Sequence, residues 1–214
     1  PESYIYPDGI RIETIDAQRG TIKVQADTFI ETKSDSKISI EIYDGSNLVA
    51  TQDAHIESVN EKRKSMWPGR TTFGAQLEIK DAKLWSPETP HLYTCKVILR
   101  NAQEEDSAYA EFGIRSLTWG KDGICINGKR VIIRGACIHH DNGILGAACY
   151  PEAVERKIKL LAKNGYNAIR SAHNPCSKTL LEVCDRLGIL VMDEYIDHWY
   201  IHKTVHDYVD YFND

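Results

Sequence analysis

The fold of the C-terminal half is decided by residues 167–194, NAIRSAHNPCSKTLLEVCDRLGILVMDE. The stretch begins with a short apolar strand at 167–171 and continues into a helix with Ser177 as its N-cap and Gly188 at its end. The helix has an apolar stripe made of Leu180, Leu181, Cys184 and Leu187. The continuous apolar run at 189–192 predicts a strand covered on both faces. Strand, helix and strand in this order predict a βαβ unit with a parallel sheet.

The residues before this stretch extend the same pattern. Residues 151–164 predict a helix with Pro151 in its first turn and Gly165 as its C-cap, and its stripe is Val154, Ile158, Leu161 and Ala162. Asn127-Gly128, between the apolar runs 124–126 and 131–133, is typical of a type I′ hairpin turn. A (β/α)₈ TIM barrel takes about 250 residues. Three strands cannot close a barrel of this size, so residues 118–214 predict part of a larger α/β architecture, a barrel or an open sheet.

The N-terminal half follows a different period. Apolar residues alternate with polar ones at 10–12, 21–26, 37–43, 73–79 and 93–99 and again around Ala110, Phe112 and Ile114. Turn sequences such as Asp44-Gly45-Ser46-Asn47 separate these runs. About seven short alternating strands without a helical period predict an immunoglobulin-like β-sandwich over residues 1–117.

Composition excludes several classes of function. The chain of 214 residues has 26 basic and 31 acidic residues and a net charge of −5, with no basic block. Nucleic acid and membrane are therefore not expected as partners.

The six cysteines have no disulfide or metal-site spacing, so we predict free thiols and a cytoplasmic location. A periplasmic or secreted location is the alternative, because the chain starts at Pro1 and not at a methionine.

Polar and aromatic residues gather where the predicted parallel strands end, at 137–142, 170–175 and 193–199. Function in barrels and open α/β sheets concentrates at this edge. Many hydrogen-bonding groups beside an apolar surface suit a sugar. We therefore expect a carbohydrate as the substrate or ligand.

Several motifs then resemble one known family. LWSPETPHLY at 84–93, FGIR at 112–115, INGKR at 126–130 and Arg134-Gly135 are similar to conserved features of glycoside hydrolase family 2, as is the stretch 167–194. The HHDNG sequence at 139–143 most resembles the β-galactosidase type. The resemblance covers nearly the whole chain and implies a retaining enzyme that cleaves β-linked terminal sugars. It also implies that residues 118–214 form the N-terminal part of a (β/α)₈ TIM-barrel catalytic domain, truncated after three strands.

The resemblance also implies roles for individual residues. His139, His173, Asn174 and Glu194 match sugar-binding positions, and Arg170 matches an arginine that orients the nucleophile. Both catalytic glutamates of the family would lie beyond Asp214, so no catalytic residue is expected here and the isolated chain should be inactive. The sequence from Tyr195 to Trp199 departs from the family's magnesium pattern. We therefore expect no metal and no cofactor, although the full-length enzyme could use magnesium or another divalent ion. A homo-oligomer is expected.

Two other functions stay open. A metal-dependent hydrolase could use His139, His140 and Asp141, but neighbouring strand residues face opposite ways. A non-catalytic carbohydrate-binding or interaction module is the second alternative. The same alternation predicts that Asp193 and Glu194 diverge, and that His140 points away from a cleft shared by His139 and His173. The incomplete barrel, which lacks its opposite wall, predicts an open apolar sheet face at 131–133, 168–169 and Val191, covered by self-association or by the tail 203–214.

Overall fold

The computed structural model describes residues 3–30, 36–59, 70–121 and 123–194. These residues form two compact units, which are described separately. The first comprises residues 1–86 and 91–130, and the second comprises residues 87–90 and 131–214. The domain division expected after residue 117 stays a prediction. The predicted tail at 203–214 and the segment Tyr195–Trp199 lie outside the described residues.

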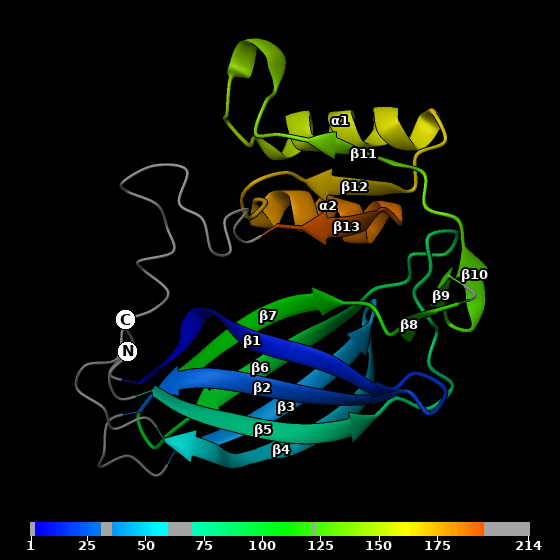
Figure 1. Ribbon diagram of the computed structural model, residues 1–214. Coiled ribbons are helices and arrows are strands. Elements are labelled where there is room, and N and C mark those ends of the chain that lie inside the picture. Colours follow the sequence, from blue (N-terminus) through cyan, green and yellow to red (C-terminus); the bar gives the residue numbers. More distant parts are fainter. Residues whose placement is uncertain (1–2, 31–35, 60–69, 122, 195–214) are drawn as a thin grey trace, which may run out of the picture. The chain divides into compact units, whose positions relative to one another are not determined.

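The first unit contains a seven-stranded antiparallel sheet (Figure 1). Its strands are β1 (Tyr4–Asp16), β2 (Thr21–Phe29), β3 (Lys37–Asp44), β4 (Asn47–Val59), β5 (Arg70–Glu78), β6 (Tyr93–Arg100) and β7 (Glu105–Phe112). The strand order is β1-β2-β5-β4-β3-β6-β7. This is the A-B-E-D and C-F-G order of a seven-stranded immunoglobulin sandwich. The sheet nearly closes on itself, because the amides of Ser3 and Ile5 donate to the carboxylates of Glu104 and Asp106 near β7.

The core of this unit follows from the alternating pattern. Ile22, Val24 and Ala26 of β2 are fully buried. Facing strands contribute Ile38, Ile40, Ile42, Cys95 and Val97 to the same cluster. The alternating runs read from the sequence are therefore confirmed as strands with one face in the core.

Strand β4 was missed by the sequence analysis. Its first half pairs with β3, from Asn47 to Ala54, and its second half pairs with β5, from His55 to Val59. One strand therefore belongs to both layers of the sandwich. Most of its side chains are exposed, so its sequence has no apolar alternation that would reveal it.

A second small sheet of β8 (Leu117–Gly120), β9 (Gly123–Ile126) and β10 (Lys129–Val131) follows. Its turn is the predicted Asn127-Gly128 pair, with φ values of 51° and 76°. The Asn127 side chain donates to the Trp85 carbonyl and accepts from the Ser116 amide. Trp85 is 1% exposed, and a side chain at Gly113 would collide with its ring. The motif around Trp85 is therefore a packing feature.

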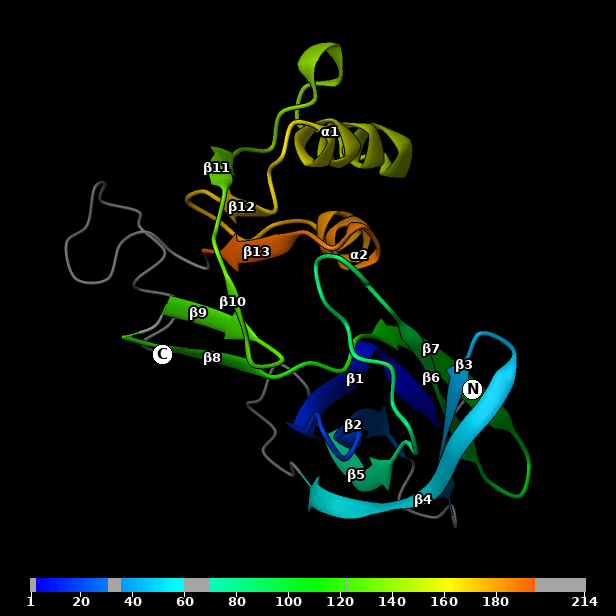
Figure 2. The same ribbon diagram turned by 90° about the vertical axis from the view of Figure 1, so that its right-hand side faces the viewer.

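The second unit has alternating strands and helices. These are β11 (Gly135–Ile138), the 3₁₀ turn η1 (Gly143–Leu145), α1 (Pro151–Lys163), β12 (Ala168–Ser171), α2 (Lys178–Leu187) and β13 (Leu190–Asp193). The three strands are parallel, in the order β11-β12-β13, and both helices cover one side of the sheet (Figure 2). The Ser177 side chain caps α2 by accepting from the Leu180 amide, and Gly188 ends it with φ 71°. The predicted parallel βαβ arrangement is confirmed.

Some predicted details of this unit are wrong. Ala162 and Leu181 are exposed, and Val183 takes the buried place on α2. Strand β13 is not covered on both faces, because Met192 is 64% exposed.

The open face of the parallel sheet also differs from the prediction. Ile169 and Val191 pack with α1 and α2, and residues 132–133 precede the parallel sheet. Because strand residues alternate, the face away from the helices carries the neighbours of Ile169 and Val191, namely Arg170 and Met192. This face is less apolar than predicted.

Candidate functional site

The candidate site lies where the three parallel strands end. The strands point in one direction, so the segments after Ile138, Ser171 and Asp193 meet at one edge of the sheet (Figure 1). These segments carry His139, His173 and Glu194. Register places Cys137 of β11, Arg170 of β12 and Met192 of β13 in one row just before that edge.

Arg170 and Glu194 form the centre of the site. The Nε and Nη2 atoms of Arg170 both donate to Oε1 of Glu194, at 2.8 and 2.6 Å. The Nη1 atom of Arg170 lies 3.1 Å from the sulfur of Cys137. The side chains of Arg170 and Glu194 are 39% and 23% exposed, so the pair is open to solvent. The hydrogen bonds to Cys137 and to Glu194 raise the pKa of Arg170.

Glu194 also binds the backbone just after the end of β12. Its Oε2 accepts from the amide of His173 at 2.8 Å. This hydrogen bond and the one from Arg170 lower the pKa of Glu194, so the carboxylate stays ionised. His173 has a φ of 79°, which a non-glycine residue adopts only at a cost in energy. The Glu194 carboxylate therefore helps to hold His173 in this strained conformation.

The two predicted sugar-binding histidines are in contact. The rings of His139 and His173 stack with centroids 5.5 Å apart and an angle of 28° between their planes. Both residues are exposed, and the predicted proximity of their imidazoles is confirmed. Asn174 is also exposed, and its backbone carbonyl accepts from the Ser171 hydroxyl. The sugar-binding roles of these residues stay predictions.

That His140 points away from a cleft shared by His139 and His173 stays a prediction. A small cavity of about 20 Å³ beneath this edge is lined by both His139 and His140, but not by His173. The prediction relied on strand alternation, and β11 ends at Ile138, so alternation no longer applies at 139 and 140. The cavity is of a size for a water molecule and too small for a sugar.

The two neighbouring carboxylates point to different partners, as predicted. Oδ1 of Asp193 accepts from the Cys176 amide, whereas Glu194 binds Arg170 and His173. They do not form a pair around a common reacting atom. Among the described residues, no three His, Cys, Asp or Glu side chains are grouped so that they could hold a metal ion.

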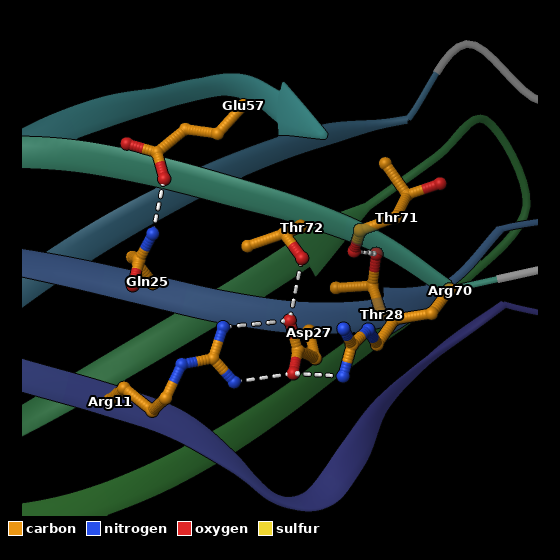
Figure 3. A network of polar contacts seen from close by, with 8 residues as sticks. All are labelled: Arg11, Gln25, Asp27, Thr28, Glu57, Arg70, Thr71 and Thr72. Carbon is orange, nitrogen blue, oxygen red and sulfur yellow. Dashed lines mark hydrogen bonds and ion pairs between the residues drawn. The ribbon is translucent and has the colours of Figure 1, made fainter. Parts of the chain in front are cut away.

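A second charged cluster lies on the β-sandwich (Figure 3). The Asp27 carboxylate is 7% exposed and is contacted by Arg11, Arg70 and Thr72. All of its partners come from the sheet or its edge, so this cluster stabilises the sandwich and is not a second candidate site.

None of the described helices is long and apolar enough to cross a membrane.

Family models match almost all of the chain. A model described as "Glycosyl hydrolases family 2" matches residues 4–115, and one described as "Glycosyl hydrolases family 2, TIM barrel domain" matches residues 119–205.

Two curated relatives extend this likeness. The β-galactosidase BoGH2A of Bacteroides ovatus is 42% identical over 168 residues, which cover 76% of this chain and 20% of the relative. A putative β-glucuronidase of Formosa agariphila is 33% identical over 210 residues, which cover 96% of this chain and 19% of the relative. The chain thus spans about one fifth of the length of these relatives.

Solved structures agree with the family models. A family 2 member from Bacteroides cellulosilyticus matches with a TM-score of 0.84 and 35% identity, over 99% of this chain and 27% of that protein. A β-glucuronidase from Bacteroides uniformis matches with a TM-score of 0.78 and 26% identity, over 96% of this chain and 25% of that protein.

Proposed function

This chain belongs to glycosyl hydrolases family 2, and from that membership we propose that it is part of a retaining glycosidase that cleaves β-linked terminal sugars. A β-galactoside is the first candidate substrate, because the relative with 42% identity is named a β-galactosidase. A β-glucuronide is the second candidate, since other relatives carry that name.

The observation that carries the proposal is the arrangement of Arg170, Glu194, His139 and His173 at one sheet edge. Arg170 is held by Glu194 and is still 39% exposed, so it can bind a further acceptor. The stacked imidazoles beside it offer hydrogen-bonding groups suited to sugar hydroxyls. This edge supplies contacts that would bind and orient a sugar.

The same geometry argues that these residues bind and do not react. A retaining glycosidase needs a nucleophile and an acid/base carboxyl group about 5–5.5 Å apart, and the acid needs a raised pKa. Both oxygens of Glu194 already accept hydrogen bonds, and its pKa is lowered. Glu194 is therefore unsuited to be the acid, and Asp193 is turned to a different partner.

We therefore place both catalytic carboxylates in sequence beyond Asp214, on further strands of a (β/α)₈ barrel that begins with β11, β12 and β13. The three parallel strands, with both helices on one side, match the start of such a barrel. In this proposal the chain contributes one wall of the sugar site.

The test compares this chain with the full-length product of the gene that encodes it, on chromogenic β-galactoside and β-glucuronide. We expect no turnover from the 214-residue chain and hydrolysis by the longer product, with the β-anomer of the sugar formed first. Arg170→Ala in the longer product should lower kcat by about a hundredfold or more, because an electrostatic contact at the reacting centre is lost.

Three results would contradict parts of this proposal. Turnover that copurifies with the isolated chain would place the chemistry within it. An α-anomer as first product would exclude retention. A longer product that binds galactose but hydrolyses neither substrate would favour the non-catalytic binding module.

A further inference from the structure

We propose that Cys137 is a positioning residue, whose sulfur fixes the orientation of the Arg170 guanidinium at the sugar-binding edge. The proposal rests on the function proposed above, because a fixed guanidinium matters for turnover only if a glycosidase site is completed here. The contact itself exists within the present chain and can be tested without any substrate.

The contact is specified by the sheet. Cys137 and Arg170 are paired residues on the adjacent parallel strands β11 and β12, so their side chains leave the same face side by side. The Nη1 atom of Arg170 lies 3.1 Å from the Cys137 sulfur. A thiol sulfur is a weak acceptor, but a charged donor strengthens the hydrogen bond.

Glu194 alone would leave the guanidinium able to pivot. Its two hydrogen bonds, from Nε and Nη2, both end on the single atom Oε1. Two bonds that share one acceptor atom fix a distance but allow the planar group to tilt about that atom. The sulfur of Cys137 holds a third nitrogen, Nη1, from another direction, and so defines the plane.

This third contact determines what Arg170 can offer to a ligand. A guanidinium has five N–H groups, and three are used by Glu194 and Cys137. One N–H on Nη1 and one on Nη2 have no acceptor among the described residues. A carboxylate or a pair of sugar oxygens binds two such donors best when both lie in a fixed plane. Cys137 therefore acts through Arg170, and we assign it no contact with the substrate.

The test follows rotation of the Arg170 guanidinium by NMR in the ¹⁵N-labelled chain, from exchange between its two Nη signals. Arg170→Lys identifies the signals by their loss. In Cys137→Ala we expect rotation to become about fivefold faster, as the loss of one modest hydrogen bond implies. Cys137→Ser should return the rate to within about twofold of the wild type, because a hydroxyl also accepts.

Controls separate positioning from general loosening. Cys149→Ala removes a half-buried thiol elsewhere in the same unit, whose sulfur contacts the Ala147 carbonyl, and should leave the rotation rate unchanged. Cys137→Val keeps a side chain of similar volume but has no hydrogen-bond acceptor. It takes the place of Cys137→Ala if the alanine variant does not fold. An unchanged rate in Cys137→Ala and Cys137→Val, or an equal rise in Cys149→Ala, would overturn the proposal. Either outcome would leave the glycosidase assignment untouched, since no turnover is measured.

Discussion

At the scale of single residues, Asp27 is the most heavily engaged carboxylate described in the sandwich. Arg11 contacts it through both terminal nitrogens, at 2.5 and 3.0 Å, while Arg70 reaches it at 3.5 Å and the Thr72 hydroxyl at 2.7 Å (Figure 3). Burial alone raises the pKa of Asp27, but the hydrogen bonds from Arg11 and Thr72 and the two positive charges outweigh it. The pKa of Asp27 is lowered as a result.

Asp27→Asn should destabilise the sandwich by about 2–3 kcal/mol at neutral pH, because two arginines lose their partner. A lowered folded-state pKa gives stability that is present above the unfolded-state pKa and is lost as pH falls through the folded-state value. The variant should therefore show a weaker loss of stability in acid than the wild type. Urea unfolding at neutral and acid pH measures both effects. Asp53→Asn, at an exposed carboxylate of β4, is the control. Equal acid sensitivity in all three proteins would contradict this role for Asp27.

Glu194 leads to a prediction at the site itself. Its pKa is lowered by the His173 amide and by Arg170, so it should stay ionised at pH values where free glutamate is already protonated. The His173 amide proton shift, followed by NMR, should change with a midpoint below the ordinary range of glutamate. The midpoint should rise in Arg170→Lys, because lysine cannot replace the two N–H groups of the guanidinium that donate to Glu194. A midpoint in the ordinary range for the wild type would mean that the contact does not persist in solution.

Sequence reasoning found four residues of this site and missed one. His139, Arg170, His173 and Glu194 follow from the rule that parallel strands end at one edge, together with the family motifs. Cys137 was predicted only to be a free thiol, with no role at the site, whereas it is exposed and contacts Arg170. The signal that could have found it is register, because pairing of β11 with β12 places Cys137 beside Arg170.

At the scale of elements, α2 shows how local sequence sets a boundary. The Ser177 side chain accepts from the Leu180 amide in the first turn, and the same amide also donates to the Ser177 backbone carbonyl. Ser177→Ala should lower the stability of the second unit by about 1 kcal/mol, whereas Ser177→Asp should keep most of it. Unfolding followed by helical circular dichroism checks this. A loss as large in the aspartate variant as in the alanine variant would show that the side-chain cap is not the cause.

The helices and strands that were predicted correctly are those with one buried face, because such a face gives a regular spacing of apolar residues in the sequence. Helices α1 and α2 were recognised from one apolar stripe and from caps, and β2, β3 and β6 from alternation. Leu181 was misplaced because α2 is buried by Leu180, Val183 and Cys184, so the centre of its buried face is shifted from the expected stripe. Apolar identity alone does not decide which edge of a stripe faces the core.

At the scale of the whole molecule, the six cysteines are all free thiols, as the sequence predicted. Burial raises the pKa of Cys95 and of Cys184 to about 12, so these two should react slowly while the protein is folded. Cys137, which is exposed, should react first. A thiol reagent should count close to six in the denatured, unreduced chain. Four or fewer would mean that disulfides form.

The division of β4 between two layers has a consequence for how this sequence can diverge. The strand is specified by backbone pairing on two sides, to β3 and then to β5, while most of its side chains face solvent. Only Ala50 and Ala54 pack against the core, and these must stay small. A saturation scan of residues 47–59 should therefore accept almost any exposed substitution and reject proline where the backbone amide donates to β3 or β5. Among homologues, we expect the backbone path of β4 to be preserved while its amino-acid sequence changes. Sequence similarity should therefore be lowest in this segment, which connects the two layers of the sandwich.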